Sequence, residues 1–531
     1  MDLLWQKESN DAGALYIDLF KDISADFRDA VAVIAKSKNV HRIEKSNELS
    51  EAYRNQGNVQ FQERKWFEAM NLYNASLCFA ESGSENVSLA YANRSACFLR
   101  LRQYEKCLAD IELAKKARYP EHLMQKLNKR RADCLKLMKS DDRGEEIVAK
   151  LSYKADENFP GMANVLKIEY NEEFGRYISA KCDIPAGKTV LVDESAVPPS
   201  HGMQQYSCCA VCAKSSMNFI PCGQCTNALF CNSGCANVNS IHKMECQYNL
   251  FDPASDIEFF VRSIFLGLSS FEHVDDFITF VDDTVHDKSK MVPDTLKDMK
   301  SKYRGFLQLF IFSTPENLPK YLQNAYKMYT ILLLLESVEK QFDAIDKKRF
   351  LMHLTLHHVC VMASNAYSSK GNKTCVSIVQ SYLNHACAAN LLSTDDGKYA
   401  ICTTVRPVRA GQQLFVTYFG ELFCTRPVDF CQTYLFQTYG FQCKCERCKP
   451  NPSLMKQLNL ASDPTFKLVA KEMRIQPSHE FGKKKLIALQ KKCVDLLNRV
   501  GDKHWCNELG FIMHSYGNIF EILHTKSVDS T

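Results

Sequence analysis

The sequence predicts a multidomain α+β fold, in which two strand-rich segments are separated along the chain by a cysteine-rich segment and a helical one. Three observations predict it. Small and aromatic residues recur at helical spacing from about residue 49, the apolar pattern changes to a period of two near residue 163, and cysteines crowd residues 209–246. Because 531 residues exceed what one apolar core usually supports, we expect several modules.

Composition and charge exclude several classes of protein. With 46% hydrophobic and 24% charged residues the chain is typical of a folded, soluble protein. The net charge of +5 is too small for a nucleic-acid-binding surface, so direct nucleic-acid binding is not expected. The apolar run 331–335 is too short to cross a bilayer, and the charged start lacks the apolar run of a signal peptide. We therefore expect an intracellular protein, cytoplasmic and nuclear, with no membrane contact.

Residues 1–48 are predicted to be helical and peripheral, and residues 49–140 form a helical repeat. The repeat resembles the tetratricopeptide repeat, in which small residues let helices approach and aromatic residues fill the gaps. A plain helical bundle is the alternative. In either case stacked helix pairs would offer a concave surface for peptides or proteins. The repeated positions are Tyr53, Gly57, Phe61, Ala69 and Tyr73, then Tyr91, Ala96, Tyr104, Ala109 and Ala114.

Alternating apolar residues predict strands in two separate places. The first set spans residues 164–197 and is broken at Gly175 and at the Pro185–Gly187 turn; the second spans 376–420. Between them, residues 255–375 are rich in Leu and Phe and mostly helical. After residue 450 the chain is helical again, and the lysines of 482–500 are expected on a solvated helix face. Within the second set, strands are predicted over residues 376–386, 399–408 and 412–420.

The cysteine spacings predict metal sites. Disulfides explain 24 cysteines poorly in a reducing compartment, whereas paired thiolates and imidazoles at short spacing suit tetrahedral zinc. Residues 209–246 supply eight such ligands in four pairs, the complement of two ions. A third group, Cys443, Cys445 and Cys448, lacks a fourth ligand, for which Cys387 is the candidate. The eight paired ligands are Cys209, Cys212, Cys222, Cys225, Cys231, Cys235, His242 and Cys246.

The paired spacing closely resembles the MYND zinc finger. The resemblance implies an interleaved arrangement, with one ion held by the first and third pairs and the other by the second and fourth. It also implies a protein-docking role, often toward proline-containing peptides, and no catalysis at the zinc ions. The first ion would be bound by Cys209, Cys212, Cys231 and Cys235, and the second by Cys222, Cys225, His242 and Cys246.

The order of all these segments resembles the SET- and MYND-domain family of protein-lysine methyltransferases, in its type-four branch that carries tetratricopeptide repeats. The segment 384–387, Asn-His-Ala-Cys, the strand ending in Val-Thr-Tyr-Phe-Gly and the Cys-x-Cys-x-x-Cys tail carry the resemblance, which covers about residues 49–450. It implies a SET β-fold split by the finger and the helical insert. The implied divisions are 1–48 helical, 49–140 repeats, 160–207 first SET part, 208–247 MYND finger, 250–375 helical insert, 376–420 second SET part, 421–450 post-SET zinc segment and 451–531 helical.

The resemblance further implies transfer of a methyl group from S-adenosylmethionine to a lysine of a histone or non-histone protein. MYND and tetratricopeptide surfaces would bind partners, transcriptional corepressors among them, and three zinc ions would be bound. Tyr418 and Tyr439 would be catalytic. The cofactor-binding residues would be Gly175, Arg176, Asn365, Asn384, His385, Tyr418 and Phe441.

Some positions depart from the family pattern. Ala386 and Ala389 stand where serine and proline are usual, and Tyr177 stands where a glycine is usual and would be strained if that position required positive φ. Gln412 and Gln413 replace common acidic residues. Two functions therefore stay open at this point: an active lysine methyltransferase, and an adaptor with weak or no activity that keeps the SET fold for its shape.

Overall fold

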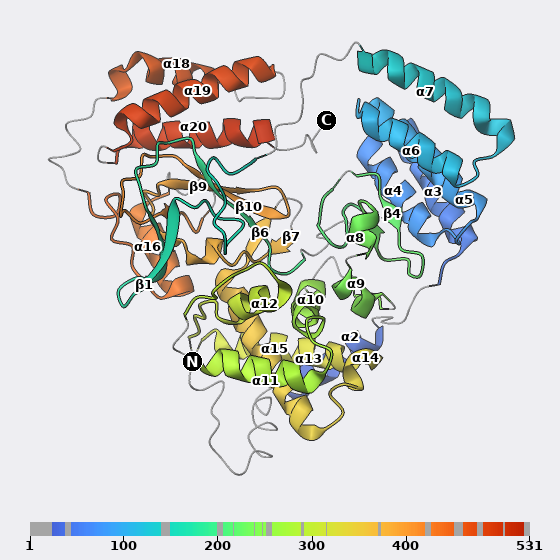
Figure 1. The fold of residues 1–531 in the computed structure, drawn as a ribbon, viewed down its shortest axis with the longest axis horizontal. Helices are drawn as coiled ribbons and strands as arrows, with labels where there is room; N and C mark the ends of the chain where they lie inside the picture. The colour runs from blue at the N-terminus through green and yellow to red at the C-terminus, as the bar shows by residue number, and fades with distance from the viewer. Residues whose placement is uncertain are drawn as a thin grey trace.

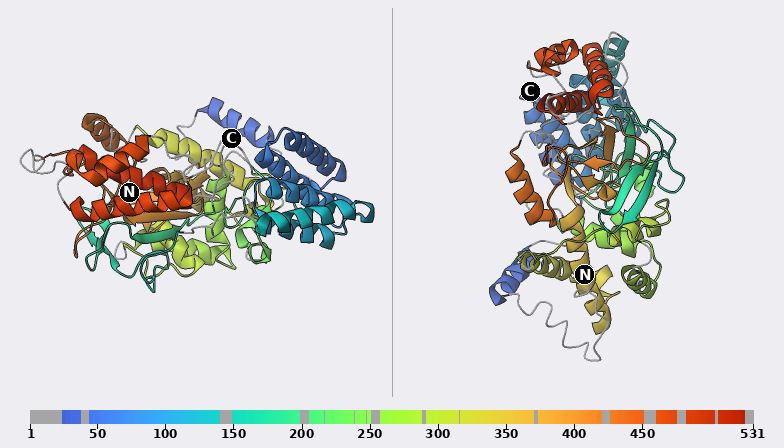
Figure 2. Two further views of the ribbon diagram at one scale, coloured as in Figure 1. Left: turned by 90° about the horizontal axis from the view of Figure 1, so that it is seen from above. Right: turned by 90° about the vertical axis from the view of Figure 1, so that its left-hand side faces the viewer.

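Helical repeats and C-terminal helices occupy opposite upper corners of the molecule, a helical insert forms the base, and the strands and the cysteine-rich finger lie between them (Figure 1). The two helical groups lie at opposite ends in the view from above as well (Figure 2). No helix among the described residues is both long and apolar enough to cross a membrane. The computed structural model describes residues 24–37, 44–139, 149–198, 205–215, 217–237, 239–246, 248–250, 257–287, 291–314, 316–369, 373–419, 426–450, 460–474, 482–502 and 505–524.

The N-terminal part consists of helix pairs, as the repeat predicts. Each helix from α3 to α7 packs against the next. The turn inside each of the first two pairs has the same backbone, with Arg64 and Arg102 at φ of 63° and 55°. A side chain at Gly57 would collide with the Tyr73 ring, so the glycine allows this close approach. The helices are α3 (Asn47–Gln62), α4 (Trp66–Phe79), α5 (Glu85–Arg100), α6 (Tyr104–Lys116) and α7 (Met124–Lys139).

The peripheral N-terminal helix is α2 (Ala25–Ser37), which packs against the helical insert instead of the repeats. The rest of the helix predicted for residues 1–48, over 1–23 and 38–43, lies outside the described residues.

Strands from both predicted strand-rich segments join into common sheets, so the β-fold is split along the chain. Strands β1 (Leu166–Asn171) and β2 (Gly175–Ala180) form an antiparallel hairpin. Strand β3 (Thr189–Glu194) pairs with β10 (Tyr399–Thr404), which also pairs with β9 (Leu391–Asp395). The short strands β8 (Asn384–His385) and β11 (Phe415–Val416) pair in parallel.

The strand predicted over 376–386 is wrong for most of its length. The chain instead makes a 3₁₀ turn at Gln380–Tyr382 and enters a strand only at Asn384. The cause is Asp193, whose buried carboxylate accepts hydrogen bonds from the Val379 and Gln380 N–H groups at 2.8 and 3.0 Å. Burial raises the pKa of this carboxyl to about 7, against the opposing effect of those two bonds.

The helical insert forms most of the largest apolar core. One buried polar cluster of the insert centres on His358, whose ring nitrogens meet Ser263 Oγ at 2.7 Å and Tyr303 Oη at 3.0 Å. Burial holds the pKa of His358 well below its ordinary value. The helices are α10 (Ile257–Leu268), α11 (Val274–His286), α12 (Met299–Leu307), α13 (Leu318–Leu333), α14 (Glu336–Glu339) and α15 (Ile345–Asn365), followed by the hairpin β6 (Tyr367–Ser369) and β7 (Lys373–Cys375).

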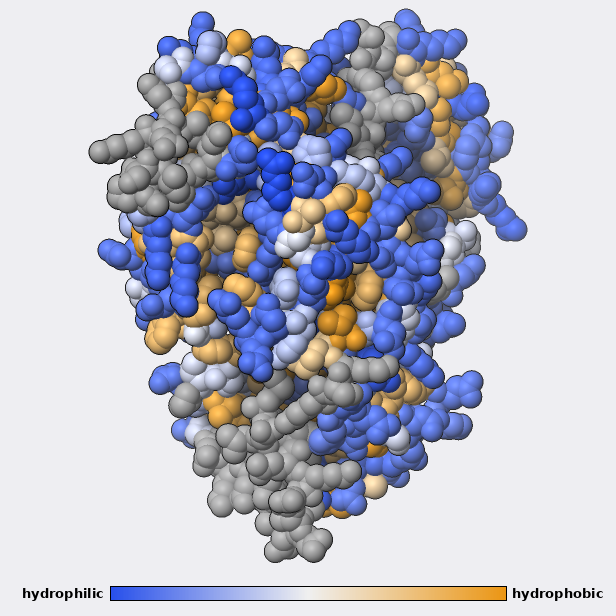
Figure 3. Space-filling model, turned by 60° about the vertical axis from the view of Figure 1, so that its left-hand side comes forward, coloured by the Kyte–Doolittle hydropathy of each residue, from blue (hydrophilic) through white to orange (hydrophobic). Residues whose placement is uncertain are grey.

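The C-terminal helices pack on the SET strands through α20, which contacts β9. On α19 the apolar stripe from Leu486 to Leu497 is buried and Lys484, Lys491 and Lys492 are exposed, as the sequence predicts. On the face of the molecule that Figure 3 shows, apolar side chains form separate patches between hydrophilic residues. The helices of this half are α16 (Val428–Tyr439), α18 (Pro464–Arg474), α19 (Lys483–Val500) and α20 (Asn507–His524).

Candidate functional site

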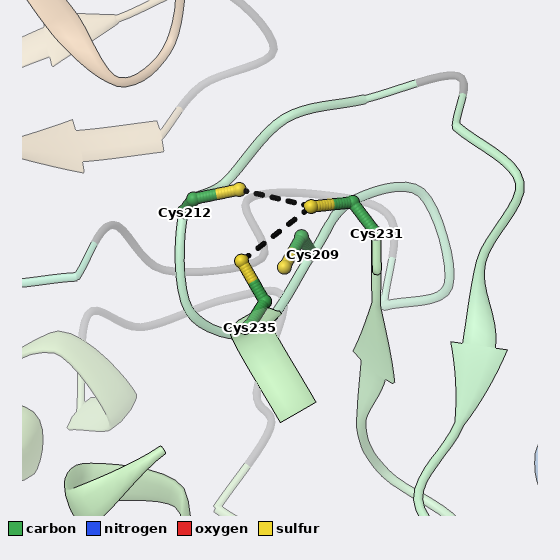
Figure 4. A group of neighbouring side chains, drawn as sticks. All are labelled: Cys209, Cys212, Cys231 and Cys235. Atoms are coloured by element: carbon green, nitrogen blue, oxygen red, sulfur yellow. Dashed lines mark hydrogen bonds between the residues drawn. The ribbon is translucent and has the colours of Figure 1, made fainter. Parts of the chain in front are cut away.

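Two tetrahedral ligand sets lie in the finger, in the interleaved pairing that the MYND resemblance implies. Within each set the four ligand atoms all lie within 4.8 Å of one another. Figure 4 shows the first set, in which Cys231 Sγ lies 3.5 Å from the sulfur atoms of Cys212 and Cys235. Four soft ligands without an open position fit structural zinc. The sets are Cys209, Cys212, Cys231 and Cys235, and Cys222, Cys225, His242 and Cys246.

Short secondary structure elements place these ligands. The hairpin of β4 (Ile220–Pro221) and β5 (Leu229–Phe230) and the helices α8 (Ser233–Asn237) and α9 (Ser240–Glu245) form the finger. His242 lies on α9 with its Nε2 3.7 Å from Cys225 Sγ, and its Nδ1 lies 3.5 Å from Glu245 Oε1. Arg262 of α10 donates to both oxygens of Glu245 at 2.9 Å. The SET insert thus holds a carboxylate beside the ligand histidine, where it can orient the His242 ring once zinc is bound.

A third set joins distant parts of the SET region. Cys387 is fully buried just after β8, while Cys443, Cys445 and Cys448 follow α16. The four sulfur atoms lie within 4.8 Å of one another, and those of Cys387 and Cys448 are 3.5 Å apart. The structure therefore brings together the four thiols that the sequence suggested, and four thiolates suit structural zinc. Zinc binding itself stays a prediction here.

His385 links this thiol cluster to the tyrosine predicted to be catalytic. Its Nδ1 accepts the Tyr418 backbone N–H at 3.0 Å, so the ring proton is on Nε2. Nε2 lies 3.3 Å from Cys387 Sγ and donates toward it. A zinc-bound thiolate at Cys387 would strengthen that bond, because a charged acceptor binds N–H more strongly.

Asn384 fixes the turn between β1 and β2. Its Nδ2 donates to the carbonyl oxygens of Phe174 at 3.2 Å and Arg176 at 3.4 Å. Between them, Gly175 has φ of 62°, and a Cβ atom there would enter open space. This space lets a ligand approach the backbone closely, which suits the S-adenosylmethionine contact that the resemblance implies.

Four aromatic rings surround the end of β11. The Tyr418 ring lies 4.8 Å from that of Tyr439, 5.2 Å from His385 and 6.4 Å from Phe441, perpendicular to the last. The Tyr418 hydroxyl donates to the Leu383 carbonyl at 3.1 Å. Burial raises the pKa of Tyr439 to about 12 and that of Tyr418 further, so both stay protonated at neutral pH.

A cavity of about 970 Å³ opens on one side of Tyr418. Asn365, Tyr418 and Tyr439 line it, whereas Gly175, Asn384 and the other predicted cofactor residues do not. Tyr418 therefore lines the cavity and also contacts His385, which follows Asn384 in the chain. Further lining residues are Ala366, Phe419, Phe430, Tyr434, Met513, His514 and Glu521.

Two predicted residues have polar contacts of their own. The Asn365 side chain, at the end of α15, donates to the carbonyls of Phe310 and Val361 at 2.7 Å. The Arg176 guanidinium donates to the Gln308 carbonyl of the helical insert and lies 5.2 Å from the centre of the Tyr382 ring, which belongs to the second SET part. The prediction for Arg176 therefore concerns its backbone alone.

Comparison with known proteins gives the same domain. The sequence pattern of the family described as SET domain matches residues 175–419. A "SET and MYND domain-containing protein" of Dictyostelium discoideum is 24% identical, covering 54% of this chain and 82% of that protein. Residues 175–419 of this chain therefore match a SET domain, and the chain is similar to SET- and MYND-domain proteins.

Relatives named "Protein-lysine N-methyltransferase SMYD4" are also similar to this chain. The one from Pongo abelii is 23% identical over 75% of this chain and 66% of its own length. The one from Danio rerio is 26% identical over 40% of this chain and 31% of its own length. The alignments thus span about a third to two thirds of these two curated relatives.

The departures from the SET and MYND pattern cause no backbone strain. Tyr177 lies inside β2 opposite Glu169 and does not have positive φ. The turn at Ala389, where proline is usual in the family, is held by the side chain of Asn390. Its Nδ2 donates to the Gln413 carbonyl, and its Oδ1 accepts from the Phe415 N–H. The strain expected at Tyr177 is therefore absent, because in this hairpin Gly175, and not Tyr177, has positive φ.

Sequence reasoning missed two contributions to the site. Met513, His514 and Glu521 on α20 line the cavity although they follow Tyr418 by a long stretch of chain. Asp193 fixes the turn that leads into Asn384. The apolar residues of α20 recur at helical spacing, which indicates a buried face. No local signal in the sequence indicates which element that face contacts.

Proposed function

We propose that this chain is a protein-lysine N-methyltransferase that uses S-adenosylmethionine. One observation carries the proposal: Tyr418 contacts His385, next to the Asn384 that holds the turn, and it also lines a cavity together with Tyr439. The names of the relatives support it. The substrate would be a lysine side chain of a protein, either a histone or another protein.

The cofactor side is assigned to Gly175, the Arg176 backbone, Asn384, His385 and Phe441. When bound, S-adenosylmethionine supplies an electrophilic methyl group on a sulfonium. The Asn384 amide keeps the turn at Gly175 in place, and the Phe441 and Tyr418 rings offer faces that favour a cation. Asn365, whose side-chain nitrogen is engaged, is assigned to the amino-acid end of the ligand, so the part of the cavity that it lines belongs to the cofactor side.

The substrate side is the part of the cavity lined by Tyr418 and Tyr439. The lysine amine has to be neutral to attack, and the aromatic rings of the cavity lower its pKa because the charged form loses hydration beside them, against the opposing effect of Asp395 and Glu521, which also line the cavity. Since Tyr418 and Tyr439 stay protonated, their hydroxyls orient the amine without taking its proton. Positioning is then the main source of acceleration.

Three structural zinc ions would keep this geometry. The third is assigned to Cys387, Cys443, Cys445 and Cys448, where it would hold Tyr439 and Phe441 beside His385 and Tyr418. Closure of that loop by metal would contribute to folding directly. No contact in the described residues favours the adaptor function over the enzyme.

Transfer of labelled methyl groups tests the proposal. The zinc-loaded protein and labelled S-adenosylmethionine are incubated with a cell extract, and labelled lysine is measured after hydrolysis. We expect labelling, and in Tyr418→Phe at least a tenfold decrease, because the hydroxyl that orients the amine is lost. Absence of labelling by the wild-type protein, or equal labelling by the variant, would contradict the proposal.

A further inference from the structure

The MYND finger lies between the tetratricopeptide helices and the SET region, and it contacts both (Figure 1). On the repeat side, α4 contacts strand β4 of the finger. Cys78 of α4 is buried in one cluster with Phe219 and Leu229 of the finger. The contact is therefore packed, and its polar groups must find partners.

Arg94 of α5 is the central polar residue of this contact. It is fully buried, and its guanidinium donates two bonds of 2.7 Å to the Asp110 carboxylate. The same guanidinium donates to the Phe219 carbonyl of the finger at 3.0 Å and to Asn74 Oδ1 at 2.8 Å. The guanidinium of the buried Arg94–Asp110 ion pair thus uses a further N–H to bond the backbone of the finger.

Two asparagine side chains extend the same network. Asn74 of α4 donates to the Tyr206 carbonyl at 2.9 Å. From the finger, Asn218 donates to Asp110 Oδ1 at 2.7 Å and to the Lys106 carbonyl at 2.8 Å. Since each side donates to the other, the surfaces are complementary in hydrogen bonding as well as in shape.

The outer edge of β4 has no backbone donor left for an added strand. Cys222 N–H bonds Ala228 O within the hairpin, so in an antiparallel pair the backbone groups of Phe219 and Pro221 point outward. Pro221 has no N–H, the Phe219 N–H bonds Met217 O, and the Phe219 carbonyl accepts from Arg94.

On the other strand of the hairpin, the outward Leu229 carbonyl accepts from Ala210 N–H at 2.8 Å. Peptides that bind by strand addition need a free edge with donors and acceptors. In the described residues the Phe219 N–H and carbonyl and the Leu229 carbonyl at the outer edges of this hairpin are already engaged.

The finger is fixed equally on the SET side. Lys373 of β7 is buried and donates from Nζ to the Ala213 carbonyl at 2.9 Å. Arg262 of α10 binds Glu245 on α9, as described above. Direct polar contacts therefore tie the finger to both neighbours at once.

We propose that the partner of the MYND finger in this protein is its own tetratricopeptide module, which closes the hairpin edge and sets helices α3–α7 in one position relative to the SET cavity. The surface of α4 and α6 is then not a site for external peptides. Only the remaining faces of the repeats are open to a protein partner. The inference is independent of the methyltransferase proposal, because it rests on contacts outside that site.

Hydrogen–deuterium exchange on the full, zinc-loaded protein tests this. Asn218→Ala removes the finger's two bonds to Asp110 and Lys106 without touching a zinc ligand. We expect exchange of the amides over residues 205–230 to rise by on the order of tenfold or more, since each lost bond contributes about 1 kcal/mol net. Asn74→Ala should act in the same direction through Tyr206.

Asn93→Ala is the matched control, because Asn93 donates to Asn58 Oδ1 at 2.9 Å within the repeats and does not contact the finger. It should leave exchange over 205–230 unchanged, and the zinc content of all variants should equal that of the wild-type protein. Equal finger exchange in Asn218→Ala and Asn93→Ala would overturn the proposal. So would small-angle scattering of the wild-type protein that requires several positions of helices α3–α7.

Discussion

The turn at Gly175 is predicted to bind cofactor only while Asn384 holds it. The Asn384 amide makes two long hydrogen bonds, of 3.2 and 3.4 Å, to the carbonyls on either side of that glycine. At about 0.5–1 kcal/mol each, their loss in Asn384→Ala amounts to roughly 1–2 kcal/mol. If the turn is free to move in the variant, that energy is lost from cofactor binding, and Kd for S-adenosylmethionine rises about 5- to 30-fold.

Isothermal titration calorimetry of the zinc-loaded protein measures this Kd. Asn93→Ala, which removes one asparagine hydrogen bond in the repeats, should bind as the wild-type protein does. Circular dichroism and zinc content check that both variants are folded. A Kd in Asn384→Ala equal to that of the control would show that the turn is not held through this side chain. Absence of heat with the wild-type protein would instead remove the cofactor assignment altogether.

Three further predictions concern the zinc sites and the helical insert. Metal analysis should find three zinc ions per chain in the wild-type protein and two in Cys387→Ser, because a hydroxyl replaces a buried thiolate. Glu245→Gln should weaken one finger zinc by about 10- to 100-fold in chelator competition, since the carboxylate that orients His242 is lost. Burial lowers the pKa of His358, so its contribution to stability is present above pH 6.5 and is lost below it. From pH 7.5 to 5.5 urea denaturation should show about 1.4 kcal/mol of loss from this group, absent in His358→Gln.

Each of these has a distinct contrary result. Three ions retained in Cys387→Ser would mean that another residue completes the third site. If folded Glu245→Gln binds zinc as tightly as the wild-type protein does, the contact between Arg262 and Glu245 contributes to packing and not to zinc binding. An equal loss of stability on acidification in His358→Gln and the wild-type protein would assign the pH dependence to other groups.

Much of the fold was predictable because its signals are local. The ligand spacing from Cys209 to Cys246 lies within one short segment, and the helix pairs repeat the same turn at Arg64 and Arg102. Apolar residues alternate with a period of two in two separate regions, which indicated that the β-fold is split along the chain. The predicted α+β arrangement is confirmed. These features depend on neighbours in sequence, which a pattern records.

What could not be predicted depends on contacts between distant residues. The strand expected at 376–386 is a turn because a carboxylate 187 residues before Gln380 caps it. The contact of Arg94 with Phe219 spans 125 residues and follows no period. Arg176 was recognised by position, yet only the structure shows its guanidinium turned toward the insert.

The cavity is lined by residues of α20 and by residues of the SET region, and these two groups can change independently in evolution. Met513, His514 and Glu521 line the cavity from α20, whereas Tyr439 lines it from the end of α16 and Tyr418 from just after β11. If the cavity admits the substrate as proposed, exchanges on α20 would change which targets fit while both tyrosines stay the same. In directed-evolution libraries this helix is the place to begin.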